Sequence, residues 1–228
     1  MPLMPIKDIA LTFVPRLGTR AVAYLLECFG LAEAIYSASA QELISRAELR
    51  EDVARSIAEG AGMREAEREA TYCLRHDIKV IASTDEYYPS LLREIDDYPA
   101  VIYLRGNAEA LKARSVAFVG TRKISSYGQR MCNELVQGFA ECVPDAVVVS
   151  GLAYGVDSAC HRAALQYGLT TVGVVANALP SITPTAHQHL AEDMISHGGA
   201  VITELSSQTK QNGRYYITRN RIIAAIAA

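Results

Sequence analysis

Hydrophobic residues in the first third of the chain recur at helical spacing. Between residues 11 and 29 they follow one another at intervals of three and four, which is the pattern of an amphipathic helical face. Thr19 stands where it can cap a helix, and Ser39, with Glu42 three residues later, has the spacing of a capping box. We therefore expect residues 1–78 to form a small domain of short helices.

From residue 79 onward the pattern changes to short, continuously apolar runs that alternate with helical periods. The expected strands are residues 79–82, 101–107, 116–119, 146–149, 170–175 and 200–203, and the expected helices are residues 127–142, 157–167, 186–197 and 218–228. Such alternation predicts an α/β fold, a Rossmann-like, doubly wound and mostly parallel sheet with right-handed crossovers. The last helix stops in an uncapped apolar run, so we expect a domain at residues 79–228 that is shortened at its C-terminal end.

The composition is that of a chain able to bury a core, since half of its 228 residues are hydrophobic and 21% are charged. The first hundred residues hold 11 Lys and Arg against 17 Asp and Glu, whereas the remainder holds 11 against 8. Any surface for a polyanion is therefore expected in the second half. Five scattered cysteines argue against a disulfide framework or a zinc ribbon, and no apolar run approaches the ~20 residues of a membrane span. We predict a soluble cytoplasmic protein without a metal site.

The turn after the apolar run 116–119 combines glycine with positive charge. Glycine permits a tight turn at the carboxyl end of a strand, where open α/β sheets bind ligands, and a serine can cap the following helix, whose free N–H groups favour an anion. The spacing matches neither G-x-x-x-x-G-K nor G-x-G-x-x-G, so it predicts an anion site without a nucleotide cofactor. The alternative is an ordinary turn with solvated basic side chains. The binding residues predicted here are Gly120, Thr121, Arg122, Lys123 and Ser125.

The next apolar run leads into a segment with two glycines. The first of them, Gly151, lets the backbone approach a neighbour or a phosphate, and we count it among the binding residues. Asp157 and His161 stand one helical turn apart, a spacing that suits acid–base chemistry but more often serves structure. We therefore expect both residues to have a structural or orienting role, with Asp157 capping or orienting the following helix, and we predict no catalytic residue. Glu204, after the run 200–203, is expected to anchor an arginine or to cap the strand.

Residues 206–228 contain no acidic residue, and basic residues alternate there with tyrosines. Cations contact phosphates and rings stack on unpaired bases, so this composition is typical of single-stranded nucleic acid binding. The alternative is a solvated basic loop before a helix. The binding residues predicted in this segment are Lys210, Tyr216, Arg219, Asn220 and Arg221.

Several of these motifs occur together in a characteristic order. They are Val119–Arg122, Ser150–Asp157, His161 with Arg162, Gly198 and Gly199 with Glu204, and Arg219–Ala224, preceded by Tyr88–Leu92 and Tyr103–Asn107. In order and spacing, from about residue 85 to 224, they resemble the DNA-processing protein A (DprA/Smf) family. Residues 8–60 look like the helix-hairpin-helix (SAM-like) domain that often precedes it. Two motifs depart from the family pattern: its Tyr-Pro loop reads Thr183-Pro184 here, and its Asn-Phe reads Tyr215-Tyr216.

The resemblance implies a DNA-binding domain, without known catalysis or cofactor, that protects incoming single-stranded DNA in natural transformation and helps to load RecA recombinase. It places the family's Gly-(Ser/Thr)-Arg turn at Gly120–Arg122 and its Arg-Asn-Arg element at Arg219–Arg221. RecA contact and self-association in the family draw on a region that follows Ala224. RecA and a homodimer are therefore partners that only the resemblance implies.

Two other functions stay open on the sequence alone. A nucleotide-processing enzyme of the lysine-decarboxylase-like phosphoribohydrolase type has a related fold with Gly-Gly and Glu motifs, although Gly198–Ile202 lacks that group's Pro-Gly-Gly-x-Gly-Thr run. The other is a scaffold whose acidic helical domain binds only protein. Release of free base from nucleoside monophosphates would identify the enzyme.

Overall fold

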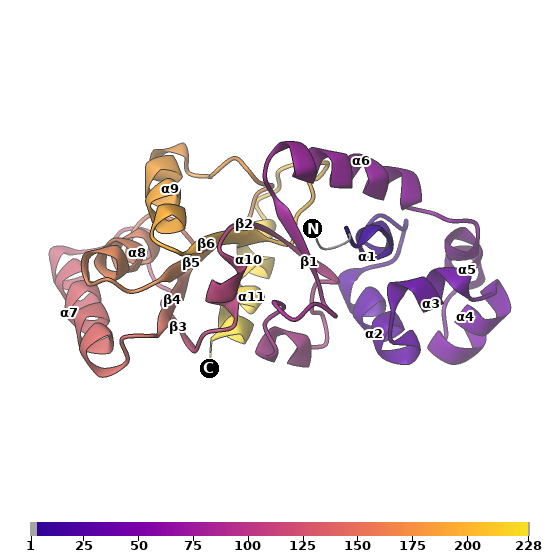
Figure 1. Ribbon diagram of the computed structural model, residues 1–228, viewed down its shortest axis with the longest axis horizontal. Coiled ribbons are helices and arrows are strands. Elements are labelled where there is room, and N and C mark those ends of the chain that lie inside the picture. Colours follow the sequence, from indigo (N-terminus) through magenta and orange to yellow (C-terminus); the bar gives the residue numbers. More distant parts are fainter. Residues whose placement is uncertain (1–3, 228) are drawn as a thin grey trace. The chain divides into compact units, whose positions relative to one another are not determined.

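The computed structural model describes residues 4–227, which form two compact units (Figure 1). One unit, the helical unit, comprises the described residues up to Glu86 together with Arg93–Ile102. The other, the α/β unit, comprises Tyr87–Leu92 and the described residues from Tyr103 onward. The boundary predicted between residues 78 and 79 lies inside the first unit, because β1 (Lys79–Ala82) and the start of β2 (Val101–Gly106) belong to that unit.

Short helices make up most of the first unit, as the spacing of its hydrophobic residues predicts. They are α1 (Ile6–Leu11), α2 (Thr19–Phe29), α3 (Ala32–Ser37), α4 (Ala40–Ala47), α5 (Glu51–Ala58) and α6 (Met63–Arg75). Their apolar faces meet in a core that fully buries Ile9, Leu25, Ile35, Leu43 and Ile57. Burial of these side chains, rather than intrinsic helix propensity, stabilises helices this short.

The two predicted helix caps of this unit have different outcomes. At α4 the capping box is confirmed: the Glu42 N–H donates to the Ser39 hydroxyl at 3.3 Å, and the Ser39 N–H donates to the Glu42 carboxylate at 2.8 Å. At α2 the expected cap is wrong. Thr19 is the first helical residue, and Gly18, which has no side chain to accept a hydrogen bond, occupies the capping position.

The sheet contains six strands in the order β1-β2-β6-β5-β4-β3, where the last four are β3 (Ser115–Ala117), β4 (Val147–Ser150), β5 (Thr171–Val174) and β6 (Ala200–Thr203). Strands β3 to β6 are parallel, and the register pairs Val116 with Val148 and Val149 with Val172. Strand β2 runs antiparallel to β6. The predicted α/β class with a mostly parallel sheet is therefore confirmed. The strand expected at 116–119 ends at Ala117, and Val119 is 62% exposed.

The parallel strands are each followed by helical structure: α7 (Ser126–Cys142), α8 (Val156–Gln166), α9 (Gln188–Ser196), the single turn α10 (Tyr215–Thr218) and α11 (Asn220–Ile226). Short 3₁₀ turns lie elsewhere along the chain: η1 (Leu91–Glu94) before β2, η2 (Ala108–Leu111) before β3 and η3 (Thr185–His187) before α9. Figure 1 shows α7, α8 and α9 on one side of strands β3 to β6 and α11 on the other side. Val136, Val148, Cys160 and Ala164 are buried between α7, α8 and the sheet. Because β3 to β6 run in parallel, the turns that follow them all lie on the same side of the sheet, at the carboxyl ends of these strands; we call this side the carboxyl edge of the sheet.

Candidate nucleic-acid interface

The turn between β3 and α7 is held by its own hydrogen bonds. The Thr121 hydroxyl accepts from the Lys123 N–H at 3.1 Å, and the Ser125 hydroxyl accepts from the Gly128 N–H at 3.1 Å as the cap of α7. A side chain at Gly120 would meet Val156 at 2.6 Å, so only glycine fits there. The polar groups of Thr121 and Ser125 thus fix the turn.

This turn packs closely against the loop between β4 and α8. The Val156 N–H donates to the Thr121 carbonyl at 3.1 Å. Gly155 has a φ of +84°, and a side chain there would lie 2.8 Å from the Arg122 Cα atom. Both the backbone conformation and the lack of space require glycine at this position. The backbone of Arg122 is therefore fixed, whereas its side chain is exposed.

Arg122 contacts the ring of Tyr216, which α10 supplies. The guanidinium carbon lies 5.1 Å from the ring centroid, within the range of a cation–π interaction. Tyr216 is half-buried, and Lys123 beside Arg122 is exposed. The structure thus brings together a basic turn and an aromatic residue that are far apart in the sequence and that the sequence predicts for the same function.

Arg219 follows Tyr216 by three residues and is only 5% exposed. One guanidinium nitrogen donates to the carbonyl oxygen of Gly151 at 2.7 Å and also to the carbonyl oxygen of Val174. Burial lowers the pKa of Arg219, and the negative charge of Asp157 opposes that shift. The expectation that Arg219 contacts phosphate directly is therefore corrected: its guanidinium joins the ends of β4 and β5 inside the unit.

Gly151 is buried as well, which corrects the expectation that it contacts the ligand. The space where a side chain would stand is taken by the guanidinium of Arg219 and the carboxylate of Asp157. The close approach that the glycine permits is therefore to a neighbouring side chain and not to a phosphate. Any larger residue would displace the buried arginine.

Asp157 and His161 both lie inside the α/β unit. Asp157 accepts a hydrogen bond from the Ala153 N–H at 3.4 Å. Burial raises the pKa of the Asp157 carboxyl, whereas this hydrogen bond and the positive charge of Arg219 lower it. His161 Nδ1 lies 2.7 Å from the Thr171 hydroxyl, which itself donates to a carbonyl, so the ring nitrogen is the donor. Burial, with the nearby charges of His187 and Arg219, lowers the pKa of His161 to about 3. The ring is uncharged at neutral pH.

The remaining predicted residues divide between anchored and exposed positions. Arg221 donates to Glu204 at 2.5 Å, and only 20% and 15% of their side chains are exposed. Asn220 and Lys210 are exposed, and so is Arg214, which is not among the predicted binding residues. Within residues 4–227, no ion pair joins Arg122, Lys123, Lys210 or Arg214 to an acidic side chain.

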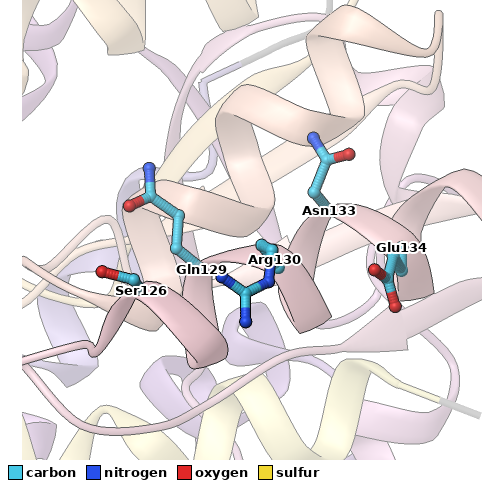
Figure 2. Close-up of a pocket in the computed structure, with 5 residues that line it drawn as sticks. All are labelled: Ser126, Gln129, Arg130, Asn133 and Glu134. Carbon is cyan, nitrogen blue, oxygen red and sulfur yellow. The ribbon is translucent and has the colours of Figure 1, made fainter.

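A shallow hollow lies along α7 and begins at its first residue. Its lining residues, shown in Figure 2, are Ser126, Gln129, Arg130, Asn133 and Glu134. They stand on successive turns of one helix, and the group includes one cation and one anion. Because these charges offset each other, the hollow attracts a polyanion less strongly than the exposed cations near the strand ends do.

Residues 4–227 contain neither a cluster of metal ligands nor a membrane-spanning helix. No set of three or more His, Cys, Asp and Glu side chains is placed to hold a metal ion. No helix in this part of the chain combines the length and the apolar character that a bilayer crossing requires. All five cysteines are free thiols.

The family model of DNA recombination-mediator protein A matches residues 79–228. DNA processing protein DprA of Streptococcus pneumoniae is 37% identical over 142 residues, which cover 62% of this chain and 49% of that protein. Protein Smf of Escherichia coli is 32% identical over 148 residues, which cover 65% of this chain and 39% of that protein. The chain thus matches about half of the length of these curated relatives, or less.

Two solved structures are similar in fold. The X-ray structure of DprA from Streptococcus pneumoniae matches all of this chain and 76% of its own, with a TM-score of 0.81 and 26% identity. A structure of DNA processing protein A from Helicobacter pylori, reported for its single-stranded DNA binding mode, matches 67% of this chain and 66% of its own, with a TM-score of 0.57 and 25% identity.

Proposed function

The chain belongs to the DNA recombination-mediator protein A family, and from that premise we propose that its α/β unit binds single-stranded DNA at the carboxyl ends of β3 to β6. The observation that carries the proposal is the contact between the exposed Arg122 guanidinium and the ring of Tyr216. This contact places a cation that can bind phosphate, Arg122, beside a ring that can stack on a base, Tyr216. Single-stranded nucleic acids are bound by this combination of cations with aromatic rings.

The charge balance at this edge supports the proposal. Two acidic residues near it, Asp157 and Glu204, have their charges offset by Arg219 and Arg221 respectively. The positive charges of the exposed Arg122 and Lys123 are therefore not offset by these two carboxylates. A surface with such exposed positive charge attracts phosphates, and the attraction weakens as salt increases.

We expect a preference for single strands over duplex. Tyr216 can stack only on an unpaired base, and stacking contributes ~1–3 kcal/mol per base where it occurs. The sequence also shows no recognition-helix motif of the kind that helix-turn-helix proteins insert into a major groove. Lys210, Arg214 and Asn220 are exposed on the segment that carries Tyr216 and extend the proposed surface.

The wider role follows from the family. We propose that the chain protects incoming single-stranded DNA in natural transformation and acts with RecA in the cytoplasm, as the resemblance implies. RecA contact and a homodimer rest on the resemblance alone. The relatives are named DNA-processing proteins, which favours this function over a phosphoribohydrolase. The burial of Asp157 and His161 also speaks against a catalytic role for that pair.

Titration of labelled oligonucleotides tests the proposal. We expect the full chain to bind a single strand more tightly than a duplex of the same sequence, with log K falling by about 0.7 per phosphate contact for each tenfold rise in salt. Equal affinity for both forms at equal salt, or an affinity independent of salt, would contradict it. Release of free base from nucleoside monophosphates would instead support the enzyme.

A further inference from the structure

Tyr154 is an exposed aromatic residue at the same sheet edge, outside the set that the sequence predicts for binding. We propose that its ring stacks on an unpaired base of bound DNA, as a second aromatic contact beside Tyr216. This inference rests on the proposed function, because it names a further part of the same interface. The signal in the sequence is a large ring placed one residue before Gly155, in a segment of otherwise small residues.

The backbone on both sides of Tyr154 is fixed to the proposed interface. On one side, the Ala153 N–H donates to the buried Asp157 carboxylate at 3.4 Å. On the other, Gly155 abuts the backbone of Arg122, and the next residue donates to the Thr121 carbonyl at 3.1 Å. Tyr154 therefore stands one residue from the turn that presents Arg122 and is held in place relative to it.

The ring of Tyr154 is supported from behind by His187. The two ring centroids are 4.9 Å apart with an interplanar angle of 64°, an edge-to-face contact. His187 is itself 4% exposed, and its Nδ1 lies 2.8 Å from the carbonyl oxygen of Leu152, to which it donates. The supporting ring is thus fixed by a hydrogen bond to the same loop.

The remainder of the Tyr154 ring faces solvent, since 51% of the residue is exposed. A tyrosine that is fixed at both backbone neighbours and supported by a second ring loses little conformational freedom when a base stacks on it. Such pre-organisation favours binding, because less entropy is lost on association. Every base has a π-face, so this contact would increase affinity without sequence preference.

A fluorescence titration tests the inference directly. The chain contains no tryptophan, so Tyr154→Trp introduces a single indole that can be excited selectively. We expect this variant to bind a single-stranded oligonucleotide within about twofold of the wild type and its emission to fall by about half or more at saturation, because stacking on a base quenches the indole. An abasic strand of equal length and charge should bind without quenching. The matched control is Leu135→Trp on α7, which is 50% exposed and should report no change in emission.

Affinity measurements give the second arm. Tyr154→Ala should lower affinity for the natural strand about fivefold or more, leave affinity for the abasic strand within about twofold, and keep the same salt dependence. An equal loss of affinity for the natural and the abasic strand would mean that Tyr154→Ala disturbs the loop. No loss of affinity in Tyr154→Ala, together with no quenching in Tyr154→Trp, would mean that Tyr154 contacts no base. Either result overturns the inference while leaving the proposed function standing. If the wild type fails to bind single strands, the proposed function fails first, and this inference fails with it.

Discussion

Two basic segments of the α/β unit use arginine in opposite ways. In the turn between β3 and α7, Arg122 has a fixed backbone and an exposed side chain whose only described ring contact is Tyr216. At the junction of α10 and α11, Arg219 is buried against two carbonyl oxygens, and Arg221 is half-buried on Glu204. Both segments look alike in composition, since each combines arginine with small or polar neighbours.

The difference shows that a basic motif can hold both binding and structural residues. A buried guanidinium needs acceptors that replace water, and the strand ends supply them at Gly151 and Val174. An exposed guanidinium keeps its hydration and is available for a phosphate. Substitutions in the two segments should therefore separate stability from DNA affinity.

The largest effect is expected at the buried arginine. Arg219→Ala leaves the Gly151 and Val174 carbonyls without their donor and the buried Asp157 without its counter-charge, so we expect a loss of about 3 kcal/mol or more in the free energy of unfolding. Urea denaturation followed by circular dichroism measures this loss. Arg214→Ala, at an exposed position five residues earlier, is the control and should stay within ~0.5 kcal/mol of the wild type. Similar losses in both variants would contradict the division between the two segments.

A smaller effect is expected from pH at His161. Its pKa is about 3 in the folded chain against an ordinary value of 6.5, so the folded state binds fewer protons, and stability falls as the pH decreases from 6.5 toward 3. Between pH 7 and pH 5 this one group should account for a loss of about 2 kcal/mol.

The measurement is the free energy of unfolding of the wild type and of His161→Gln at both pH values. The variant has a lower stability at pH 7 because the buried hydrogen bond to Thr171 changes, so the comparison concerns the slope with pH. A variant whose stability falls as steeply as that of the wild type would show that other groups cause the pH dependence.

The exposed arginine should affect binding rather than folding. We expect Arg122→Ala to lower affinity for a single-stranded oligonucleotide about tenfold and to reduce the slope of log K against log salt by about 0.7, since one phosphate contact is lost. The melting temperature should stay within about 2 °C, because an exposed side chain contributes little to stability. Arg114→Ala is the matched control, since this exposed arginine precedes β3 and so lies at the opposite end of the strand. Equal losses of affinity in both variants would indicate diffuse electrostatics instead of a site.

The smallest effect is expected in the helical unit. Its exposed cation Arg20 already pairs with Asp96 at 2.6 Å, and the first hundred residues carry an excess of acidic side chains. Arg20→Ala should therefore change affinity for single-stranded DNA by less than twofold and stability by less than ~1 kcal/mol. Loss of affinity comparable to that of Arg122→Ala, in the same oligonucleotide titration, would place part of the interface in the helical unit.

The sequence alone determined the fold class and most of the helices and strands, because the period of hydrophobic residues is a local property. Apolar runs next to glycine give β4, β5 and β6 nearly to the residue, the run 79–82 gives β1, and Ser39 with Glu42 gives the cap of α4. Motif order was enough to identify the family. The sequence also placed the basic turn Gly120–Lys123 at a strand end, where the structure has it.

Only the tertiary structure decided which cations are exposed. Arg122 and Arg219 have the same charge and similar neighbours in the sequence, but Arg219 follows a turn of helix that directs it under the ends of β4 and β5, whereas Arg122 lies on the outside of a turn. Likewise, His187 supports Tyr154 across a separation of 33 residues, which no local pattern reports. Exposure depends on what packs against a side chain from distant parts of the chain, and that is decided by the fold as a whole.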